Sequence, residues 1–185
     1  MEMNNATLDR QIHELVMQIK AALLDKGESM ATAESCTGGL IAASIVAEPG
    51  SSDILAGGIV AYRNEVKENL LGVPHAVLEQ FGAVSAQTVE AMAEDALRKF
   101  GCQWAVSTSG IAGPTGAEPG KPVGFIWMCV ANNRERVSFS EIFDGNRNEI
   151  RQKSVFHLQK TAKYDYTIKH TLPGRKTKPR TPEKA

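Results

Sequence analysis

The segment Ala33-Glu34-Ser35-Cys36-Thr37-Gly38-Gly39 decides how the rest of this sequence is interpreted. It places a hydroxyl group beside paired glycines, immediately before an apolar run of helical character, so we predict a turn between a strand and a helix. Such a turn suits a nucleophile or a polar anchor, because small residues let a ligand approach the backbone closely. The unpaired N–H groups at the start of the following helix can bind an oxyanion or a phosphate.

Outward from this segment, the chain alternates between stretches of strand and helix character. Helices are predicted over 8–26, 40–46, 65–71, 85–100 and 148–163, with the second of these starting near Thr37. Strands are predicted over 29–33, 54–62, 104–109, 123–131 and 136–143, and the last two are expected to form a hairpin. Interleaved helices and strands predict an α/β fold in which helices cover a sheet.

The composition is typical of one globular domain. The chain has 185 residues, 42% of them hydrophobic, and its zero formal net charge gives no electrostatic reason to expect nucleic acid. No apolar run approaches the roughly 20 residues of a membrane helix. Residues 1–10 lack the pattern of a secretory signal, so we expect a cytoplasmic protein without a membrane contact. The three cysteines and four histidines show no spacing typical of a disulfide framework or a metal site.

Ser35 is the candidate nucleophile, and acyl transfer is the chemistry that it suggests. A serine hydroxyl needs a nearby base, but no histidine lies in a recognisable motif, and Gly-x-Ser-x-Gly is absent around Ser35. A lysine can act as the base where burial lowers its pKa. Lys67 is the best candidate because it follows the strand ending at Tyr62 by a short turn, and Tyr62 can align the amine or relay a proton.

Each of these residues also has a structural interpretation that the sequence leaves open. Ser35 is a favoured residue for capping a helix, Lys67 can be a solvated surface lysine, and Tyr62 can be a half-buried aromatic of the strand. Cys36 competes as a nucleophile, but its neighbours offer no paired histidine. A buried small residue is therefore the preferred interpretation of Cys36.

Two further segments are candidates for binding a ligand. The loop Ser109-Gly110-Ile111-Ala112-Gly113-Pro114-Thr115-Gly116 leaves a predicted strand, and its backbone N–H groups suit a small polar ligand or a phosphate, although a plain turn explains the glycines almost as well. Arg147 can grip a phosphate or lie in solvent at the start of a helix. The candidate ligand contacts are Thr37, Gly38, Gly39, Ser109, Gly110, Gly113 and Arg147.

Taken together, these motifs resemble the CinA C-terminal domain family, whose characterised members are nicotinamide-nucleotide amidases. The likeness extends from about Leu8 to about Lys163. The matching stretches are 33–39, 49–52, 57–62, 67–73, 82–85, 109–114 and 121–124. Seven matches in the same order are far more specific than any one of them.

The resemblance implies a three-layer α/β/α sandwich with a mixed sheet, in a domain over residues 1–165. It also implies an amidohydrolase that converts nicotinamide mononucleotide to nicotinic acid mononucleotide and ammonia, with Ser35 as nucleophile, Lys67 as base and Tyr62 as helper. N–H groups near Thr37 to Gly39 would stabilise the oxyanion, while the glycine-rich loop and Arg147 would hold the ribose phosphate. No metal or organic cofactor is implied, and homo-oligomers are expected.

The sequence departs from the family pattern at two positions, which keeps other functions open. Gly116 is followed by Ala117 where the family commonly has a Gly-Gly pair, and Asn146 stands where an aspartate is common. A catalytically inactive paralogue that binds a nucleotide as a regulatory module is therefore the alternative. Residues 166–185 are expected to form a basic, disordered tail, and a polyanion contact through it is a third, less favoured idea.

Overall fold

The computed structural model describes residues 5–168, and over this range helices and strands alternate as the sequence predicts. The helices are α1 (Asn5–Lys26), α2 (Leu40–Val46), α3 (Asn64–Leu71), α4 (His75–Phe81), α5 (Ala86–Phe100) and α6 (Arg147–Ile168), with a short 3₁₀ turn, η1 (Ser51–Asp53). The strands are β1 (Met30–Glu34), β2 (Leu55–Val60), β3 (Trp104–Gly110), β4 (Phe125–Asn132) and β5 (Arg136–Ile142).

The five strands form one mixed sheet in the order β2-β1-β3-β4-β5. β1 runs parallel to both β2 and β3, whereas β4 runs antiparallel to its two neighbours, β3 and β5, so the predicted hairpin of β4 and β5 is confirmed. Because β1, β2 and β3 are parallel, their carboxyl ends meet at the same edge of the sheet. β4 starts at this edge and β5 ends there, since Gly110 pairs with Ile126, and Phe125 pairs with Ile142. Ligands of α/β proteins bind beyond such carboxyl ends.

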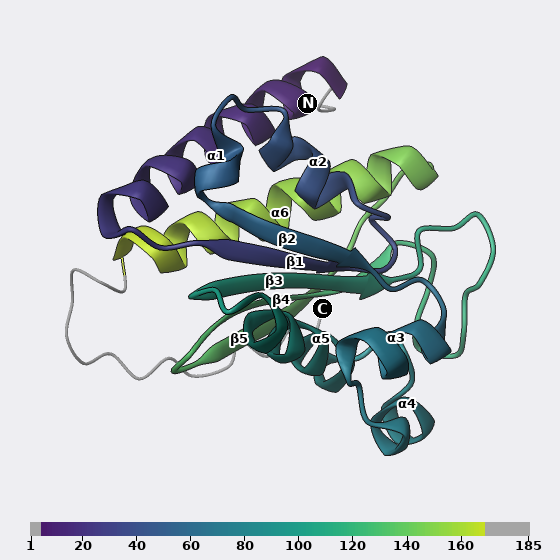
Figure 1. The fold of residues 1–185 in the computed structure, drawn as a ribbon. Helices are drawn as coiled ribbons and strands as arrows, with labels where there is room; N and C mark the ends of the chain where they lie inside the picture. Colours follow the sequence, from purple (N-terminus) through teal and green to yellow (C-terminus); the bar gives the residue numbers. More distant parts are fainter. Residues whose placement is uncertain (1–4, 169–185) are drawn as a thin grey trace.

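Helices cover both faces of the sheet, which confirms the three-layer α/β/α fold (Figure 1). α1, α2 and α6 lie on one face, and α3, α4 and α5 lie on the other. Each face has its own apolar core. The first includes Val16, Ile41 and Ile126, and the second is built around Val89 and Met92 of α5. Burial of these side chains holds the layers together, at about 1.5–3 kcal/mol for each large one.

The end residues of α5 match the signals in the sequence. Ser85 is the N-cap, and its hydroxyl accepts a hydrogen bond from the N–H of Thr88 at 3.3 Å. Gly101 closes the helix with φ 60°, a left-handed conformation that glycine adopts without steric cost. This helix is therefore predictable from local sequence alone.

Four helices differ from the sequence prediction by more than one residue. α1 starts at Asn5, three residues before the predicted start. α2 starts at Leu40 instead of near Thr37, because Gly38 and Gly39 have φ values of 62° and 93°, which a right-handed helix does not accommodate. α4 was not predicted; it is short and starts directly after Pro74. α6 starts one residue earlier than predicted and continues to Ile168, so residues 166–168 belong to a helix and not to the tail. The rest of the predicted tail, 169–185, lies outside the described residues.

None of the helices within residues 5–168 is long and apolar enough to span a membrane.

Candidate active site

Ser35 is the first residue beyond β1, at the edge where the three parallel strands end. Its N–H donates to the carbonyl of Thr108 in β3 at 3.0 Å, which fixes the backbone of the residue in the middle of the sheet. The side chain is buried, with 8% of the residue exposed, yet it lines a cavity. Because the backbone of Ser35 is fixed at the end of a central strand, its hydroxyl is placed to react with a ligand in that cavity.

Lys67 is a buried lysine, and its amine contacts the hydroxyl of Ser35. The residue lies in α3 and is only 1% exposed. Its Nζ lies 3.1 Å from Ser35 Oγ, 2.9 Å from the carbonyl oxygen of Ala61 and 3.1 Å from that of Tyr62. All three partners are neutral oxygens, so no carboxylate in these contacts offsets the cost of burying a charge. The surface interpretation of Lys67 is therefore wrong.

Burial lowers the pKa of Lys67 below its ordinary value of 10.5, and this outweighs the opposing influence of Cys36. A neutral amine has two N–H donors and one lone pair. The carbonyls of Ala61 and Tyr62 can accept the two donors, which leaves the lone pair facing Ser35 Oγ. The geometry therefore suits a base that removes the serine proton.

Tyr62 takes part through its backbone more than through its ring. Its carbonyl accepts from Lys67, whereas its hydroxyl bonds to the guanidinium of Arg147 at 2.6 Å. The residue lies beyond the end of β2 and is 56% exposed, so it is not a half-buried strand aromatic. The expected alignment of Lys67 comes from the Tyr62 carbonyl. A proton relay through the hydroxyl is not supported, because that group contacts Arg147.

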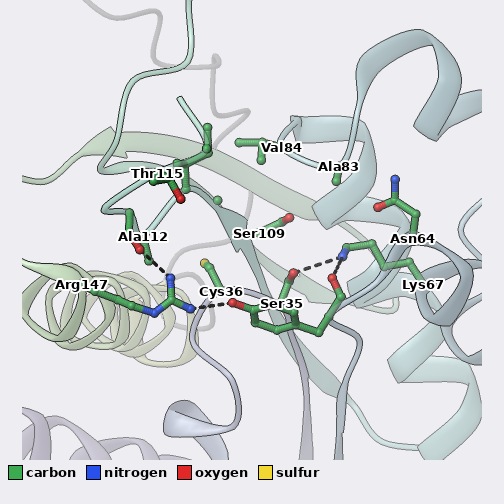
Figure 2. Close-up of a pocket in the computed structure, with 15 residues that line it drawn as sticks. Ser35, Cys36, Asn64, Lys67, Ala83, Val84, Ser109, Ala112, Thr115 and Arg147 are labelled. Atoms are coloured by element: carbon green, nitrogen blue, oxygen red, sulfur yellow. Dashed lines mark hydrogen bonds between the residues drawn. The ribbon is translucent and has the colours of Figure 1, made fainter. Parts of the chain in front are cut away.

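The cavity between these groups has a volume of about 250 Å³. Figure 2 shows Lys67 and Arg147 approaching it from opposite sides, with Ser35 and Cys36 between them. Its lining residues are Ser35, Cys36, Tyr62, Asn64, Lys67, Ala83, Val84, 109–113, Thr115, Gly116 and Arg147. The lining contains no acidic side chain. A neutral amide or an anionic group can therefore enter without repulsion from carboxylates.

The glycine-rich loop and Arg147 come together at the cavity, although they are far apart in the sequence. Ser109, Gly110 and Gly113 all line it, and the guanidinium of Arg147 donates to the carbonyl of Gly113 at 2.7 Å. Arg147 is exposed, starts α6 and lines the cavity. The structure thus brings together four of the seven predicted ligand contacts.

The other three predicted ligand contacts, Thr37, Gly38 and Gly39, do not line the cavity, and their expected role needs correction. The N–H of Gly38 donates to the carbonyl of Ser35 at 3.0 Å, and that of Gly39 donates to Glu34 Oε2 at 3.0 Å. The Thr37 hydroxyl is fully buried against Glu34 and Thr108. The two glycine N–H groups are occupied, so they are not free to receive an oxyanion.

Cys36 lines the cavity next to Ser35 but is not set up as a nucleophile. Burial is the main cause that raises the pKa of its thiol to about 12. The thiol therefore stays protonated near neutral pH, and a protonated thiol is a poor nucleophile. The preferred interpretation of Cys36 as a small buried residue agrees with its environment.

Asn64 is a cavity residue that the sequence interpretation missed. It lies three residues before Lys67 in α3, on the same face of the helix, so the spacing could have identified it. Ala83 and Val84 come from the segment before α5, and no local signal marks them as lining residues. Within residues 5–168, no cluster of His, Cys, Asp and Glu could hold a metal ion.

Comparison with known proteins places this geometry in a family. A model of the CinA C-terminal domain matches residues 12–162. The Nicotinamide-nucleotide amidohydrolase PncC of Enterobacter agglomerans is 47% identical over 153 residues, covering 82% of this chain and 93% of that protein. A CinA-like protein of Prochlorococcus marinus (strain NATL2A) is 42% identical over 157 residues, which cover 84% of this chain but only 35% of that protein.

A solved structure agrees with these relatives. The competence/damage inducible protein CihA from Agrobacterium tumefaciens superposes with a TM-score of 0.79 at 37% identity, covering 82% of this chain and 93% of that chain. The chain spans about a third of the length of several curated relatives and nearly the whole of PncC. The family match covers most of the described residues and includes every side chain that lines the cavity, so the chain belongs to the CinA C-terminal domain family.

Proposed function

We propose that this protein is an amidohydrolase that converts nicotinamide mononucleotide to nicotinic acid mononucleotide and ammonia. The observation that carries the proposal is the 3.1 Å contact between Lys67 Nζ and Ser35 Oγ, made by a buried amine whose other partners are neutral carbonyls. The substrate is suggested by the name of the Enterobacter agglomerans relative. The homo-oligomer and the cytoplasmic location stay predictions.

The reaction would proceed in two halves. Lys67 accepts the proton of Ser35 as Oγ forms a bond to the carboxamide carbon, and the carbonyl oxygen becomes an oxyanion. The C–N bond then breaks, and Lys67 returns the proton to the departing nitrogen, which leaves as ammonia. Water attacks the resulting acyl-enzyme and gives one proton to Lys67, which passes it back to Ser35 Oγ as the bond to the acyl carbon breaks. The carboxylic acid product loses its remaining proton to solvent and leaves as the carboxylate.

Oxyanion stabilisation is assigned to the N–H of Cys36. Cys36 follows the nucleophile directly and lines the cavity, and within the described chain its N–H contacts its own thiol but donates to no backbone group of another residue. A backbone N–H next to a nucleophile is a common oxyanion donor. It would take the role that Gly38 and Gly39 cannot fill.

Arg147 and the glycine-rich loop are assigned to the phosphate. Arg147 lines the cavity, and its guanidinium keeps the N–H groups that Gly113 and Tyr62 do not use. An arginine can bind a phosphate through two parallel hydrogen bonds. The lack of acidic side chains in the lining supports an anionic ligand.

The two departures from the family pattern have structural explanations that do not require lost activity. Asn146 caps α6: its side chain accepts from the N–H groups of Asn148 and Glu149 at 3.0 and 3.2 Å, and Glu149 Oε2 accepts from the Asn146 N–H at 2.8 Å. Asparagine and aspartate cap helices about equally well. Ala117 has no positive φ, so a glycine is not needed there.

Ammonia release from nicotinamide mononucleotide tests the proposal, using purified wild-type protein and Ser35→Ala. We expect turnover by the wild type and a loss of at least about 10³-fold in the variant. Equal rates would remove Ser35 as the nucleophile. Binding of the nucleotide by calorimetry without any turnover by the wild type would support the alternative, a regulatory module.

A further inference from the structure

Glu34 is the residue immediately before the proposed nucleophile, and its carboxylate is fully buried, with 0% of the residue exposed. Oε2 accepts hydrogen bonds from the Thr37 hydroxyl at 2.7 Å, the Gly39 N–H at 3.0 Å and the Ile41 N–H at 3.1 Å. Oε1 accepts from the Ala42 N–H at 2.9 Å. A carboxylate offers only acceptors, and here it meets four donors. It does not line the cavity.

These bonds make Glu34 the cap of α2. The residue at the usual N-cap position, Gly39, has no side chain and forms no side-chain cap. Three N–H groups near the start of α2 are instead satisfied by a carboxylate from the end of β1. The side chain of Glu34 therefore links the end of β1 to the start of α2 and encloses residues 35–39 in a hydrogen-bonded ring. This turn includes Ser35 and Cys36.

The backbone of Glu34 is held independently of its side chain. Its carbonyl accepts from the N–H of Ala61 at 2.8 Å, and Ala61 in turn presents its own carbonyl to Lys67. The N–H of Ser35 is bonded to β3. A change confined to the Glu34 carboxylate leaves these sheet contacts in place, so it tests the ring around residues 35–39 by itself.

The same turn has two further attachments. The Thr37 hydroxyl lies 2.8 Å from that of Thr108 in β3, and Arg151 of α6 donates to the Thr37 carbonyl at 2.8 Å. Arg151 lies one helical turn after Arg147, which faces the cavity. β1, β3 and α6 therefore all contact the turn. Of these contacts, only that of Glu34 joins the Thr37 hydroxyl to the start of α2.

We propose that Glu34 is a positioning residue for the reaction: its carboxylate fixes the 35–39 turn so that Ser35 Oγ lies within reach of Lys67 Nζ and the Cys36 N–H faces the reacting carbonyl. This inference rests on the proposed amidohydrolase function. It assigns Glu34 no contact with the substrate. Displacement of a nucleophile by about 1 Å can cost on the order of 10²-fold in rate.

The test compares Glu34→Gln with a control that loses a buried carboxylate elsewhere. Glutamine has the same shape but one acceptor oxygen, so at least one of the four donors faces an NH₂ group. The control is Asp95→Asn in α5, whose side chain is 4% exposed and pairs with Arg98 and Lys99. Both variants are expected to lose stability, and circular dichroism at a temperature below both transitions establishes that they are folded.

Three measurements follow on each protein. For Glu34→Gln we expect kcat to fall roughly ten- to hundredfold with KM within about twofold, and labelling of Ser35 by a fluorophosphonate to slow by a similar factor. We also expect faster hydrogen exchange at the N–H groups of Gly39, Ile41 and Ala42. Asp95→Asn should keep the wild-type values of kcat, labelling rate and exchange at these positions.

Wild-type kcat and labelling rate in Glu34→Gln would overturn the inference, and so would an equal loss in Asp95→Asn, because that would indicate general softening. Failure of the proposed function gives a different pattern, in which the wild type itself releases no ammonia. Hydrogen exchange then decides the inference without any substrate. Unchanged protection of the three N–H groups in Glu34→Gln would refute the role of the carboxylate in holding the turn.

Discussion

The buried amine of Lys67 couples proton binding to folding, so replacing it by methionine should change how stability depends on pH. Above about 10.5 the amine is neutral in both the folded and the unfolded chain. As the pH falls below 10.5, the unfolded chain gains a proton while the folded amine, with its lowered pKa, stays neutral. The folded state therefore loses about 1.4 kcal/mol for each pH unit. The loss stops at the folded pKa, below which both states are charged.

Methionine is a suitable replacement because it is apolar, unbranched and close to lysine in length. We expect the free energy of unfolding of the wild type, minus that of Lys67→Met, to rise with pH by about 1.4 kcal/mol per unit between the folded pKa and about 10.5. Urea unfolding from pH 7 to 11 measures this difference. Titrations of groups that do not interact with Lys67 cancel in it, and the Cys36 thiol, whose pKa is raised to about 12, titrates above this range. Lys160→Met, at an exposed position of α6, is the matched control for the same substitution outside the site.

The rate of the reaction should depend on the protonation state of the same amine. The neutral amine is the active form, so kcat/KM of the wild type should rise with pH through the folded pKa of Lys67, and Lys67→Met should lose about 10²–10⁴-fold. A stability difference that stays flat from pH 7 to 11 would refute the reasoning, because it would mean that the pKa of Lys67 is not lowered. A difference that falls with rising pH would mean that the amine is charged and stabilised in the folded protein.

Three further changes test other parts of the site and fold. Arg147→Gln should raise KM for nicotinamide mononucleotide about ten- to hundredfold, and much less for the riboside without phosphate, in steady-state assays. Asn146→Asp should keep the urea midpoint, since aspartate also caps α6, whereas Asn146→Ala should lose about 1 kcal/mol. Gly124→Ala should destabilise by about 2 kcal/mol or more in thermal unfolding, because its Cβ would lie 2.1 Å from the carbonyl oxygen of Phe143 and φ is 92°.

Most of the fold follows from local patterns in the sequence. α5 has a serine cap, a regular apolar face and a terminal glycine, and each of these signals has a direct physical cause. The start of α2 was placed too early because an apolar run does not reveal that Gly38 and Gly39 adopt left-handed conformations. α4 is only seven residues long, and so short a helix depends on tertiary packing more than on its own sequence.

The pairing of Ser35 with Lys67 could be predicted because strand ends gather at one edge of an α/β sheet. The sequence placed Ser35 after one strand and Lys67 shortly after another, and the parallel arrangement of β1 and β2 brings them together. The partner of the Tyr62 hydroxyl could not be predicted in this way. It comes from Arg147, 85 residues further along the chain, and the contact depends on how α6 packs.

Glu34 shows why the chemistry of the 33–39 segment could not be predicted from its sequence alone. A carboxylate in contact with Lys67 would stabilise the charged amine and raise its pKa. Instead, all four hydrogen bonds of Glu34 go to Thr37 and the start of α2, while the three contacts of Lys67 are neutral. The direction of this one side chain therefore satisfies two requirements of a serine–lysine mechanism together. It holds the turn that carries the nucleophile, and it leaves the amine without a counter-charge, which favours the neutral form that can accept a proton.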